Sequence, residues 1–403
     1  MEQRNIVVLA HPDWLEGYET NTKELVQKFI REHNVLFVQA PVSRTHTLSN
    51  TKHPAIKKRI SVLKREVEPL IQLQKKLWMY YPDFKEEPLG LAFNTWSYNY
   101  INKLNSQRLA KAILKVTKKI GFEDFVLFND RNPLLGMHLK ELLDPTKYIY
   151  YLSHCTFSEI NENLAAKQEE KLLKKADTII TNSRYYEYYA KKINSQTFYV
   201  GQGHTEVNKD KLFKQNKLRK LVGNHLPIIG TIARTYPENM DIAILKEMLI
   251  ERPNWNFILL SQNAAQYDFY QNSGLAEFSN FTTVHCQSEV EKNTYLQEVD
   301  VCLLPEVLNE DNIGKYPANL DTLLSLGKAV VATRHIANEL FSEHVYMAST
   351  AEEFIVKAEH ALAEDNDRLK RERIAFAGMH NWENTISAIY HSIGFGEKDT
   401  LVA

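Results

Sequence analysis

Arg234 and the turn at Pro317 occupy positions that predict chemistry. Arg234 closely follows the apolar run Ile228–Ile232, which has the pattern of a buried strand. Ligands bind at the carboxyl ends of strands in open parallel sheets, and a guanidinium can hold two phosphate oxygens at once. Pro317-Ala318-Asn319 begins a predicted helix, whose first N–H groups and dipole attract an anion. Together these features predict a site for a phosphate group.

The elements that position these residues follow from an alternation of short apolar runs with longer helical stretches. Continuous apolar strands of this kind favour parallel sheets covered on both faces. In the first half we predict strands at 6–10, 35–38, 125–128, 148–152, 178–181 and 197–200, with helices at 21–32, 134–142, 167–175 and 185–192. In the second half we predict strands at 228–232, 257–260, 282–285, 301–304 and 330–333, with helices at 242–250, 320–326, 351–363 and about 367–393.

The alternation stops once, in a stretch rich in Lys and Asn at 208–226, and then restarts. The chain has 403 residues, more than a single core usually serves. We therefore predict an α/β protein of two doubly wound Rossmann-like domains facing a cleft, residues 1–205 and 227–375, with a linker at 206–226. The last helical segment, about 376–403, is expected to pack back onto the first domain.

Composition and charge limit the expected partners and cellular location of the protein. The formal net charge is -1, which gives no reason to expect a nucleic-acid partner. Cys155, Cys286 and Cys302 lie far apart, as expected for buried thiols in a reducing compartment. The amino terminus enters a strand almost at once, without a signal-peptide pattern, and no apolar run is long enough to span a bilayer. We expect a cytoplasmic protein, or one peripheral on the inner face of the plasma membrane.

The segment Lys52–Trp78 carries many basic residues interleaved with apolar ones. A basic amphipathic helix can lie on an anionic membrane surface, and this segment is a candidate for such a contact. The alternative is a solvated helix that covers its own domain.

Several segments resemble one family of enzymes, the family-4 retaining glycosyltransferases of GT-B fold, in particular a teichuronic-acid-biosynthesis-like branch. The similar segments are residues 6–41, 150–160, 228–262, 309–333 and 380–390, and they occur in the family's order and spacing. The resemblance implies transfer of a sugar from a nucleotide-diphosphate donor to a glycan or lipid-linked acceptor, with retention, in synthesis of a surface polysaccharide or glycoconjugate. UDP and GDP are not distinguished, and no other cofactor is implied.

The resemblance also implies donor-binding residues. It places Gly230 and Arg234 in the first strand and loop of the donor domain, the segment containing Gln287 and Val290 around the nucleotide base, and Pro317, Asn319 and Thr322 around the diphosphate and ribose. Two of these positions depart from the family, which has a lysine at Asn319 and a glutamate at Thr322. Asp321 is one residue from the lost glutamate, but a helical neighbour points about 100° elsewhere.

The resemblance further places His154 and Glu310 beside the reacting sugar, and His11, Trp14 and Gly17 in a loop that meets the acceptor. Each has a structural alternative, such as a packed tryptophan in a tight turn or a solvated carboxylate. No residue presents itself as a nucleophile, so the family's front-face route is expected, in which the leaving phosphate accepts the acceptor's proton. No metal-ligand cluster is apparent, and we expect a metal-independent reaction.

Two other functions compete with this interpretation. The losses at Asn319 and Thr322 fit a GT-B-like protein that no longer binds donor and acts as a non-catalytic partner. A nucleotide-sugar epimerase on the same fold is a third alternative, which would need carboxylates and a histidine acting at the sugar ring.

Overall fold

A computed structural model describes residues 2–10, 14, 20–45, 54–153, 162–205, 207, 210, 212, 216–234, 236–309 and 312–395. The chain forms two compact units, the first made of Met1–Gly201 and Trp382–Ala403 and the second of Gln202–Asn381.

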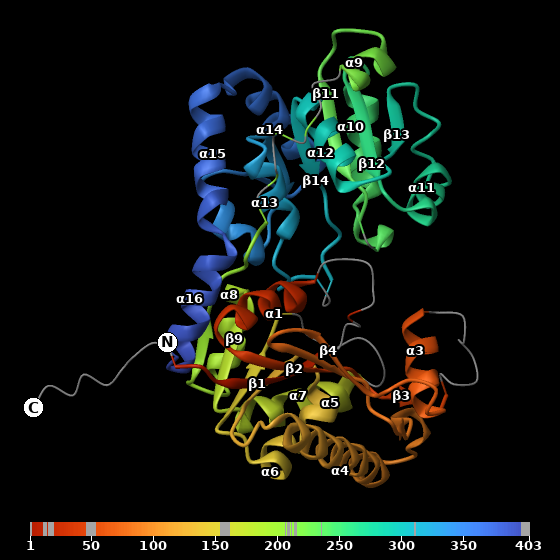
Figure 1. The fold of residues 1–403 in the computed structure, drawn as a ribbon. Coiled ribbons are helices and arrows are strands. Elements are labelled where there is room, and N and C mark those ends of the chain that lie inside the picture. Colours follow the sequence, from red (N-terminus) through yellow and green to blue (C-terminus); the bar gives the residue numbers. More distant parts are fainter. Residues whose placement is uncertain are drawn as a thin grey trace, which may run out of the picture. The chain divides into compact units, whose positions relative to one another are not determined.

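The first unit is built on an eight-stranded sheet with the order β10-β9-β8-β7-β1-β2-β5-β4 (Figure 1). All neighbours pair in parallel except β4 and β5, which are antiparallel. A separate parallel pair joins β3 and β6. The strands are β1 (Asn5–Ala10), β2 (Asn34–Val38), β3 (Val42–Ser43), β4 (Leu70–Gln74), β5 (Leu77–Tyr80), β6 (Lys85–Glu86), β7 (Val126–Asp130), β8 (Lys147–Tyr151), β9 (Thr178–Thr181) and β10 (Thr197–Tyr199).

Helices cover both faces of this sheet because its strands are apolar on both faces. In β1, Val7 and Leu9 face one core, whereas Ile6 and Val8 face the other. The first core is covered by α4 (Thr95–Ile120), α5 (Pro133–Gly136), α6 (Leu139–Leu143), α7 (Glu162–Lys175) and α8 (Arg184–Lys191), and a short η1 (Leu89–Leu91) contacts α4. The second is covered by α1 (Asn21–Glu32), α3 (Pro54–Leu63) and α16 (Trp382–Ile393).

The second unit contains a six-stranded, fully parallel sheet with the order β13-β12-β11-β14-β15-β16. The order reverses direction at β11 and β14, the position where ligands bind in doubly wound sheets. The strands are β11 (Ile228–Ile232), β12 (Asn256–Ser261), β13 (Phe281–His285), β14 (Val301–Leu304), β15 (Ala329–Thr333) and β16 (Tyr346–Ala348).

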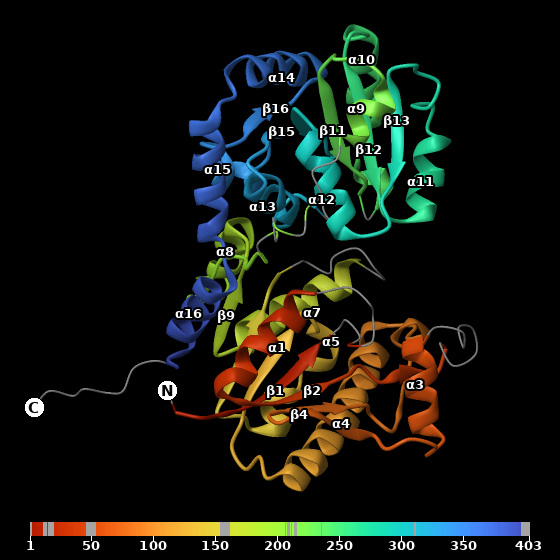
Figure 2. The same ribbon diagram turned by 45° about the horizontal axis from the view of Figure 1, so that its top comes forward.

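Two helical layers cover the second sheet (Figure 2). One face packs against α10 (Ile242–Glu251), α11 (Ala264–Gln271) and α14 (Ala351–Glu364). The other packs against α9 (Lys217–Val222), α12 (Glu289–Glu298), α13 (Ala318–Ser325), η4 (Ile336–Phe341) and α15 (Asp367–Met379). A short η3 (Pro237–Asn239) precedes α10.

The structure differs from the sequence-based expectation in the basic segment Lys52–Trp78. Only Pro54–Leu63 is helical, while Leu70–Gln74 and Leu77–Tyr80 form an antiparallel hairpin at the sheet edge. The expectation of one amphipathic helix through this segment is wrong, because the apolar residues after position 69 serve the sheet. The segment predicted as a linker also contains a helix, α9, and the predicted final helix is interrupted between Met379 and Trp382.

Candidate functional site

The second unit holds a cavity of about 430 Å³ at the carboxyl edge of its sheet. Residues within two positions of the ends of β11, β12, β14 and β15 line it, together with the start of α13. Its lining includes the predicted residues Arg234, Pro317 and Asn319. The position agrees with the general rule for open parallel sheets.

Arg234, Glu306 and His335 form a largely buried polar group in this cavity. Each follows a different strand, β11, β14 or β15, and these strands are neighbours in the sheet. Arg234 Nη2 lies 2.6 Å from Glu306 Oε1, and His335 Nε2 lies 3.3 Å from Glu306 Oε2. Sequence analysis missed Glu306 and His335, although both are polar residues within two positions of a strand's end.

Neighbouring contacts hold each member of the group in place. The backbone N–H of Arg234 donates to the Tyr270 hydroxyl at 3.2 Å, and its carbonyl accepts from Gln266 Nε2 at 2.9 Å. The backbone N–H of Glu306 donates to Thr333 Oγ1 at 2.7 Å. The loops after these strands are therefore tied to α11 and to β15.

The electrostatic state of Glu306 follows from these contacts. Burial alone would raise the pKa of Glu306, but the hydrogen bond from His335 and the charges of Arg234 and Lys315 outweigh it, so the pKa lies below its ordinary value. Glu306 is therefore ionised near neutral pH and partly compensates the positive charge of Arg234.

The group retains unused hydrogen-bonding capacity. Among the described residues, the buried Arg234 Nε and His335 Nδ1 have no hydrogen-bond partner. Buried polar atoms are nearly always satisfied, so orphaned atoms at a cavity wall indicate a polar ligand or water there. Lys292 and Lys315 also line the cavity, whose charged lining comprises Arg234, the two lysines, Glu289 and Glu306, with His335 beside them.

The amino terminus of α13 forms another part of the wall. Pro317 is its N-cap residue and provides no side-chain cap, so the first turn has no hydrogen bond from its own cap side chain. Asn319 lies in that turn and lines the cavity, whereas Thr322 does not. The residue at the family's lysine position thus faces the cavity, but carries no charge.

Asp321 does not replace the family's lost glutamate. Its side chain is buried, accepts a hydrogen bond from the Tyr316 hydroxyl at 2.7 Å, and lies 2.7 Å from His380 Nδ1. These contacts tie α13 to the residue that follows α15. Asp321 therefore has a structural role and is not part of the cavity lining.

The other predicted donor residues lie outside the cavity lining. The backbone N–H of Gln287 donates to Glu291 Oε2 at 2.8 Å, and the carbonyl of Val290 accepts from Thr294 Oγ1 at 2.7 Å. Gly230 is in the middle of β11, where an added Cβ would lie 2.6 Å from Val299 Cγ2. The need for glycine at this position is therefore explained by packing against Val299.

We expect Gly230→Ala to lower the free energy of unfolding by roughly 1–3 kcal/mol, because the added methyl overpacks the strand against Val299. Nucleotide affinity should be unchanged at a temperature where the variant is folded. Denaturant unfolding and calorimetric titration measure the two effects. A loss of affinity without a loss of stability would instead place Gly230 in the donor site.

Of the residues predicted for catalysis and acceptor binding, the structure describes Trp14. His154, Glu310, His11 and Gly17 lie outside the described residues. Trp14 is described, and its ring contacts Phe37 edge-on at 5.0 Å, against the core of the first unit. This contact matches the packed-tryptophan alternative for the loop.

The carboxyl edge of the first sheet carries polar residues that sequence analysis did not identify. Asp130, at the end of β7, is buried and accepts a hydrogen bond from Thr22 Oγ1. Arg131 Nε lies 3.4 Å from Asp130 Oδ1, and Arg131 has a φ of 51°, which is uncommon for a residue with a side chain. Backbone strain of this kind is often found at functional sites.

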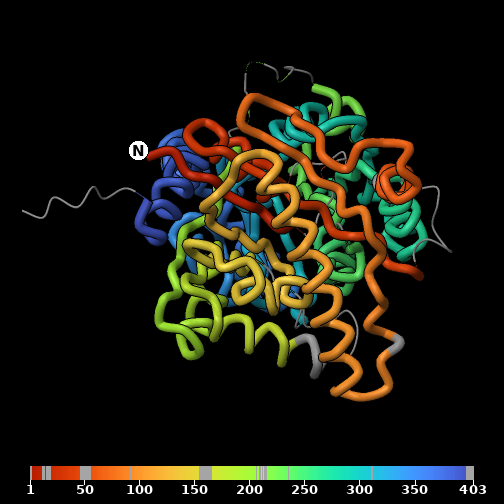
Figure 3. Tube along the Cα trace, turned by 60° about the horizontal axis from the view of Figure 1, so that its bottom comes forward, coloured from red at the N-terminus to blue at the C-terminus, as the bar shows by residue number. Residues whose placement is uncertain are grey.

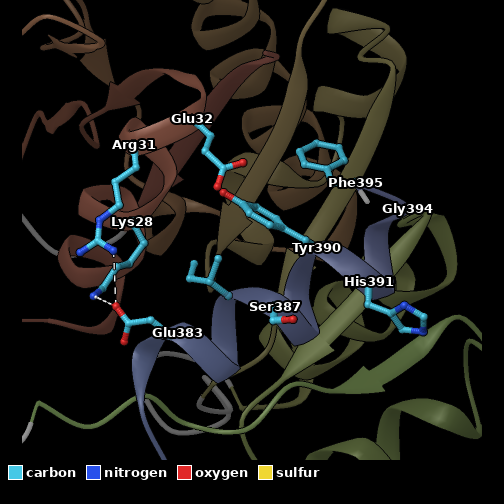
Figure 4. A pocket seen from close by; sticks show the side chains of 10 residues that line it. Lys28, Arg31, Glu32, Glu383, Ser387, Tyr390, His391, Gly394 and Phe395 are labelled. Atoms are coloured by element: carbon cyan, nitrogen blue, oxygen red, sulfur yellow. Dashed lines mark hydrogen bonds and ion pairs between the residues drawn. The ribbon is translucent and has the colours of Figure 1, made fainter. Parts of the chain in front are cut away.

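A second cavity, of about 490 Å³, lies between α1 and α16 of the first unit (Figure 4). Its basic residues Lys28 and Arg31 both contact Glu383 Oε1, at 2.7 and 3.4 Å. Tyr390 and Phe395 line it and also belong to the core. None of the predicted site residues lines this cavity, and its contacts attach α16 to α1.

Within the described ranges, no group of three His, Cys, Asp or Glu residues is arranged to hold a metal ion. Metal independence of the reaction stays a prediction.

The comparisons with known proteins agree with this architecture. The two units have the GT-B fold, since solved GT-B-like structures align over almost the whole chain. Sucrose-phosphate synthase from Thermosynechococcus elongatus aligns with a TM-score of 0.66 at 14% identity, covering 98% of this chain and 100% of that one. A glycosyltransferase from Rickettsia africae ESF-5 gives 0.67 at 12% identity, with the same coverage. HepE of Anabaena, in complex with UDP and glucose, gives 0.63 at 13% identity and covers 97% of this chain and 99% of that one.

A curated relative confirms the resemblance to the teichuronic-acid-biosynthesis-like branch. TuaH of Bacillus subtilis (strain 168), named as a teichuronic acid biosynthesis glycosyltransferase, is 24% identical over 237 residues. The match covers 56% of this chain and 58% of the relative, so it spans little more than half of either protein. No protein-family model matches the chain.

Proposed function

We propose that this chain is a glycosyltransferase that moves a sugar from a nucleotide-diphosphate donor to a glycan or lipid-linked acceptor in polysaccharide synthesis. The observation that carries the proposal is the cavity at the carboxyl edge of the second sheet, where Arg234 and the start of α13 meet. The names of TuaH and of the structural relatives support the same reaction class. The complex of HepE with UDP and glucose favours UDP as the nucleotide.

The chemistry requires that the leaving diphosphate be stabilised. Negative charge develops on it as the glycosidic bond breaks, and fixed positive groups lower the free energy of that state. Arg234, Lys315 and the amino terminus of α13 could provide these groups from one cavity. We propose that they do so without a metal ion, and that transfer occurs with retention by the front-face route.

Arg234→Ala is expected to weaken UDP binding by at least ~1.5 kcal/mol, about tenfold, because a charge-assisted contact to phosphate is lost. Calorimetric titration of the purified protein with UDP, GDP and ADP first identifies the nucleotide, and then compares the variant. Arg234→Lys should lose less UDP affinity than Arg234→Ala, because lysine keeps a positive charge opposite Glu306.

Arg252→Ala is the matched control, since Arg252 pairs with Glu359 away from the cavity lining. Equal affinity of Arg234→Ala and the wild type would remove Arg234 from the donor site. Circular dichroism of each variant separates lost affinity from lost fold.

A GT-B-like protein without donor binding is the second candidate, and two observations favour it. Asn319 faces the cavity where the family has a lysine, and Glu306 already occupies one side of Arg234. If none of UDP, GDP and ADP binds, the first proposal fails and this one takes its place.

We propose that the first unit binds the acceptor. Asp130 and Arg131 at the carboxyl edge of its sheet are residues of this chain that could contact acceptor hydroxyls. A cytoplasmic location, at the inner face of the membrane where a lipid-linked acceptor would be found, is part of the same proposal.

A further inference from the structure

The longest helix of the first unit, α4, presents one face that the fold leaves uncovered. Its 26 residues begin at a capping box between Asn94 and Ser97 and end at Gly121, which has a φ of 76°. Its inner side packs into the core through Leu109 and Ile113. Figure 3 shows the course of α4, in orange.

The uncovered face of α4 is basic. The helix contains no Asp or Glu, and its six cations are Lys103, Arg108, Lys111, Lys115, Lys118 and Lys119. Arg108 pairs with Glu87 at 2.9 Å. In the part of the chain that the structure describes, the five lysines have no carboxylate within ion-pair distance, and all five are exposed. Their charge is therefore available to an anionic partner.

The same face has an aromatic end. Phe93, Trp96 and Tyr100 are 88%, 73% and 60% exposed, unusually high values for large aromatic side chains. The rings of Trp96 and Tyr100 stack on each other at 5.6 Å with an angle of 8°. Lys103, Lys111 and Lys118 continue the line of Trp96 and Tyr100 at helical spacing, so aromatic and basic residues share one stripe.

We propose that this stripe of α4 binds the surface of an anionic bilayer, with the lysines at the lipid phosphates and the aromatic end at the boundary of headgroups and acyl chains. Trp and Tyr favour this boundary, and each lysine near an anionic surface strengthens binding about fivefold. The aromatic end favours a bilayer over nucleic acid or a soluble polyanion, which the lysines alone would also attract. No helix among the described residues is long and apolar enough to cross a membrane.

The structure favours α4 over the segment Lys52–Trp78 as the membrane contact. The helical part of that segment is short, and its cations are partly engaged within the protein. Lys58 Nζ lies 5.9 Å from the centre of the Tyr81 ring, and Arg59 Nη2 donates to Gln39 Oε1 at 3.4 Å.

Co-sedimentation of the full-length protein with vesicles tests the proposal. We expect binding to phosphatidylcholine–phosphatidylglycerol vesicles, weakening with salt, and little binding to phosphatidylcholine alone. Neutralising the three lysines of the stripe in K103Q/K111Q/K118Q should lower the partition coefficient by tenfold or more. W96S/Y100S should also lower it, and should remove a blue shift of tryptophan emission that the wild type shows on these vesicles.

A second lysine triple, K57Q/K64Q/K75Q, removes the same charge from the segment Lys52–Trp78 and serves as the matched control. Loss of binding in this variant but not in the α4 triple would overturn the proposal, as would absence of vesicle binding by the wild type. Binding to heparin that is insensitive to W96S/Y100S, without vesicle binding, would identify a soluble polyanion as the partner instead. The inference does not depend on glycosyl transfer, and UDP titration of the same variants should be unchanged.

Discussion

Replacing Glu306 with glutamine is expected to lower the free energy of unfolding of the ligand-free protein by about 3 kcal/mol, because the variant leaves a buried guanidinium without its anionic partner. The side chains of Arg234 and Glu306 are only 14% and 16% exposed, and their atoms lie 2.6 Å apart. Glutamine keeps the shape of the side chain, so the change isolates the charge. Denaturant unfolding at neutral pH measures the loss.

The same change should tighten UDP binding, on the order of tenfold, if the cavity holds a diphosphate. The carboxylate and the diphosphate compete for one cation, and removal of the carboxylate frees the charge-assisted bonds of Arg234. UDP should then raise the melting temperature of Glu306→Gln more than that of the wild type at the same concentration. Loss of stability with unchanged or weaker affinity would show that Arg234 serves the fold and not the donor.

The pH dependence gives an independent check. The folded-state pKa of Glu306 lies below its ordinary value, so the stability from its charge is present above the unfolded pKa, near 4.5. That stability is lost as the pH falls through the lower folded pKa. Glu306→Gln should not show this loss of stability at acid pH, because an amide does not titrate there. Glu289→Gln, at a carboxylate 66% exposed in the same cavity, should change stability little.

The sequence predicted the parts of the site that depend on local pattern. Arg234 comes soon after a run of buried β-branched residues, and Pro317 marks a helix start, so both were found without knowledge of the fold. Glu306 and His335 carry similar local signals, but their significance depends on β11, β14 and β15 being neighbours. The order of strands in a sheet is a long-range property. Glu306 and His335 are about 70 and 100 positions from Arg234, so no local sequence pattern shows that they meet in the fold.

The position of Asp321 also combines a feature that local pattern predicts with one that depends on long-range packing. Helical geometry alone predicts that it points away from the side of Thr322, and the structure finds it buried. Its partner His380 is 59 residues further along the chain, beyond any local pattern. The prediction of one helix through Lys52–Trp78 was wrong for a different reason. Apolar residues with near-helical spacing are also compatible with a hairpin whose two faces are partly buried.

The exposed face of α4 illustrates what only packing reveals. Sequence analysis predicted no helix at Thr95–Ile120, and aromatic residues such as Trp96 and Tyr100 would ordinarily be assigned to the core. The structure buries Tyr98 and leaves Trp96 and Tyr100 in solvent. Which of these alternating aromatics faces the sheet is decided by the register of the helix on its neighbours.

Glu169 is expected to make the protein less stable as the pH rises from 5 to 8. This carboxyl, on α7, is buried, and burial raises its pKa to about 7 despite a hydrogen bond from the Tyr150 hydroxyl at 2.7 Å. A carboxyl whose folded pKa exceeds its unfolded value prefers to be protonated in the folded state. The stability of the fold is therefore greatest below the unfolded pKa and declines until the pH passes the folded pKa.

Glu169→Gln should remove this decline, because an amide does not ionise. The shift from 4.5 to about 7 corresponds to roughly 3 kcal/mol in total, most of it lost between pH 5 and 8. The variant's stability relative to the wild type should therefore rise by about 2–3 kcal/mol over that range, whatever its value at pH 5. Glu170→Gln is the neighbouring control, since Glu170 is exposed and its hydrogen bond with Lys174 lowers its pKa. If urea unfolding gives parallel pH profiles for wild type and Glu169→Gln, Glu169 is ionised in the folded protein, and the stabilising partner must then be sought at Oε2, which has none among the described residues.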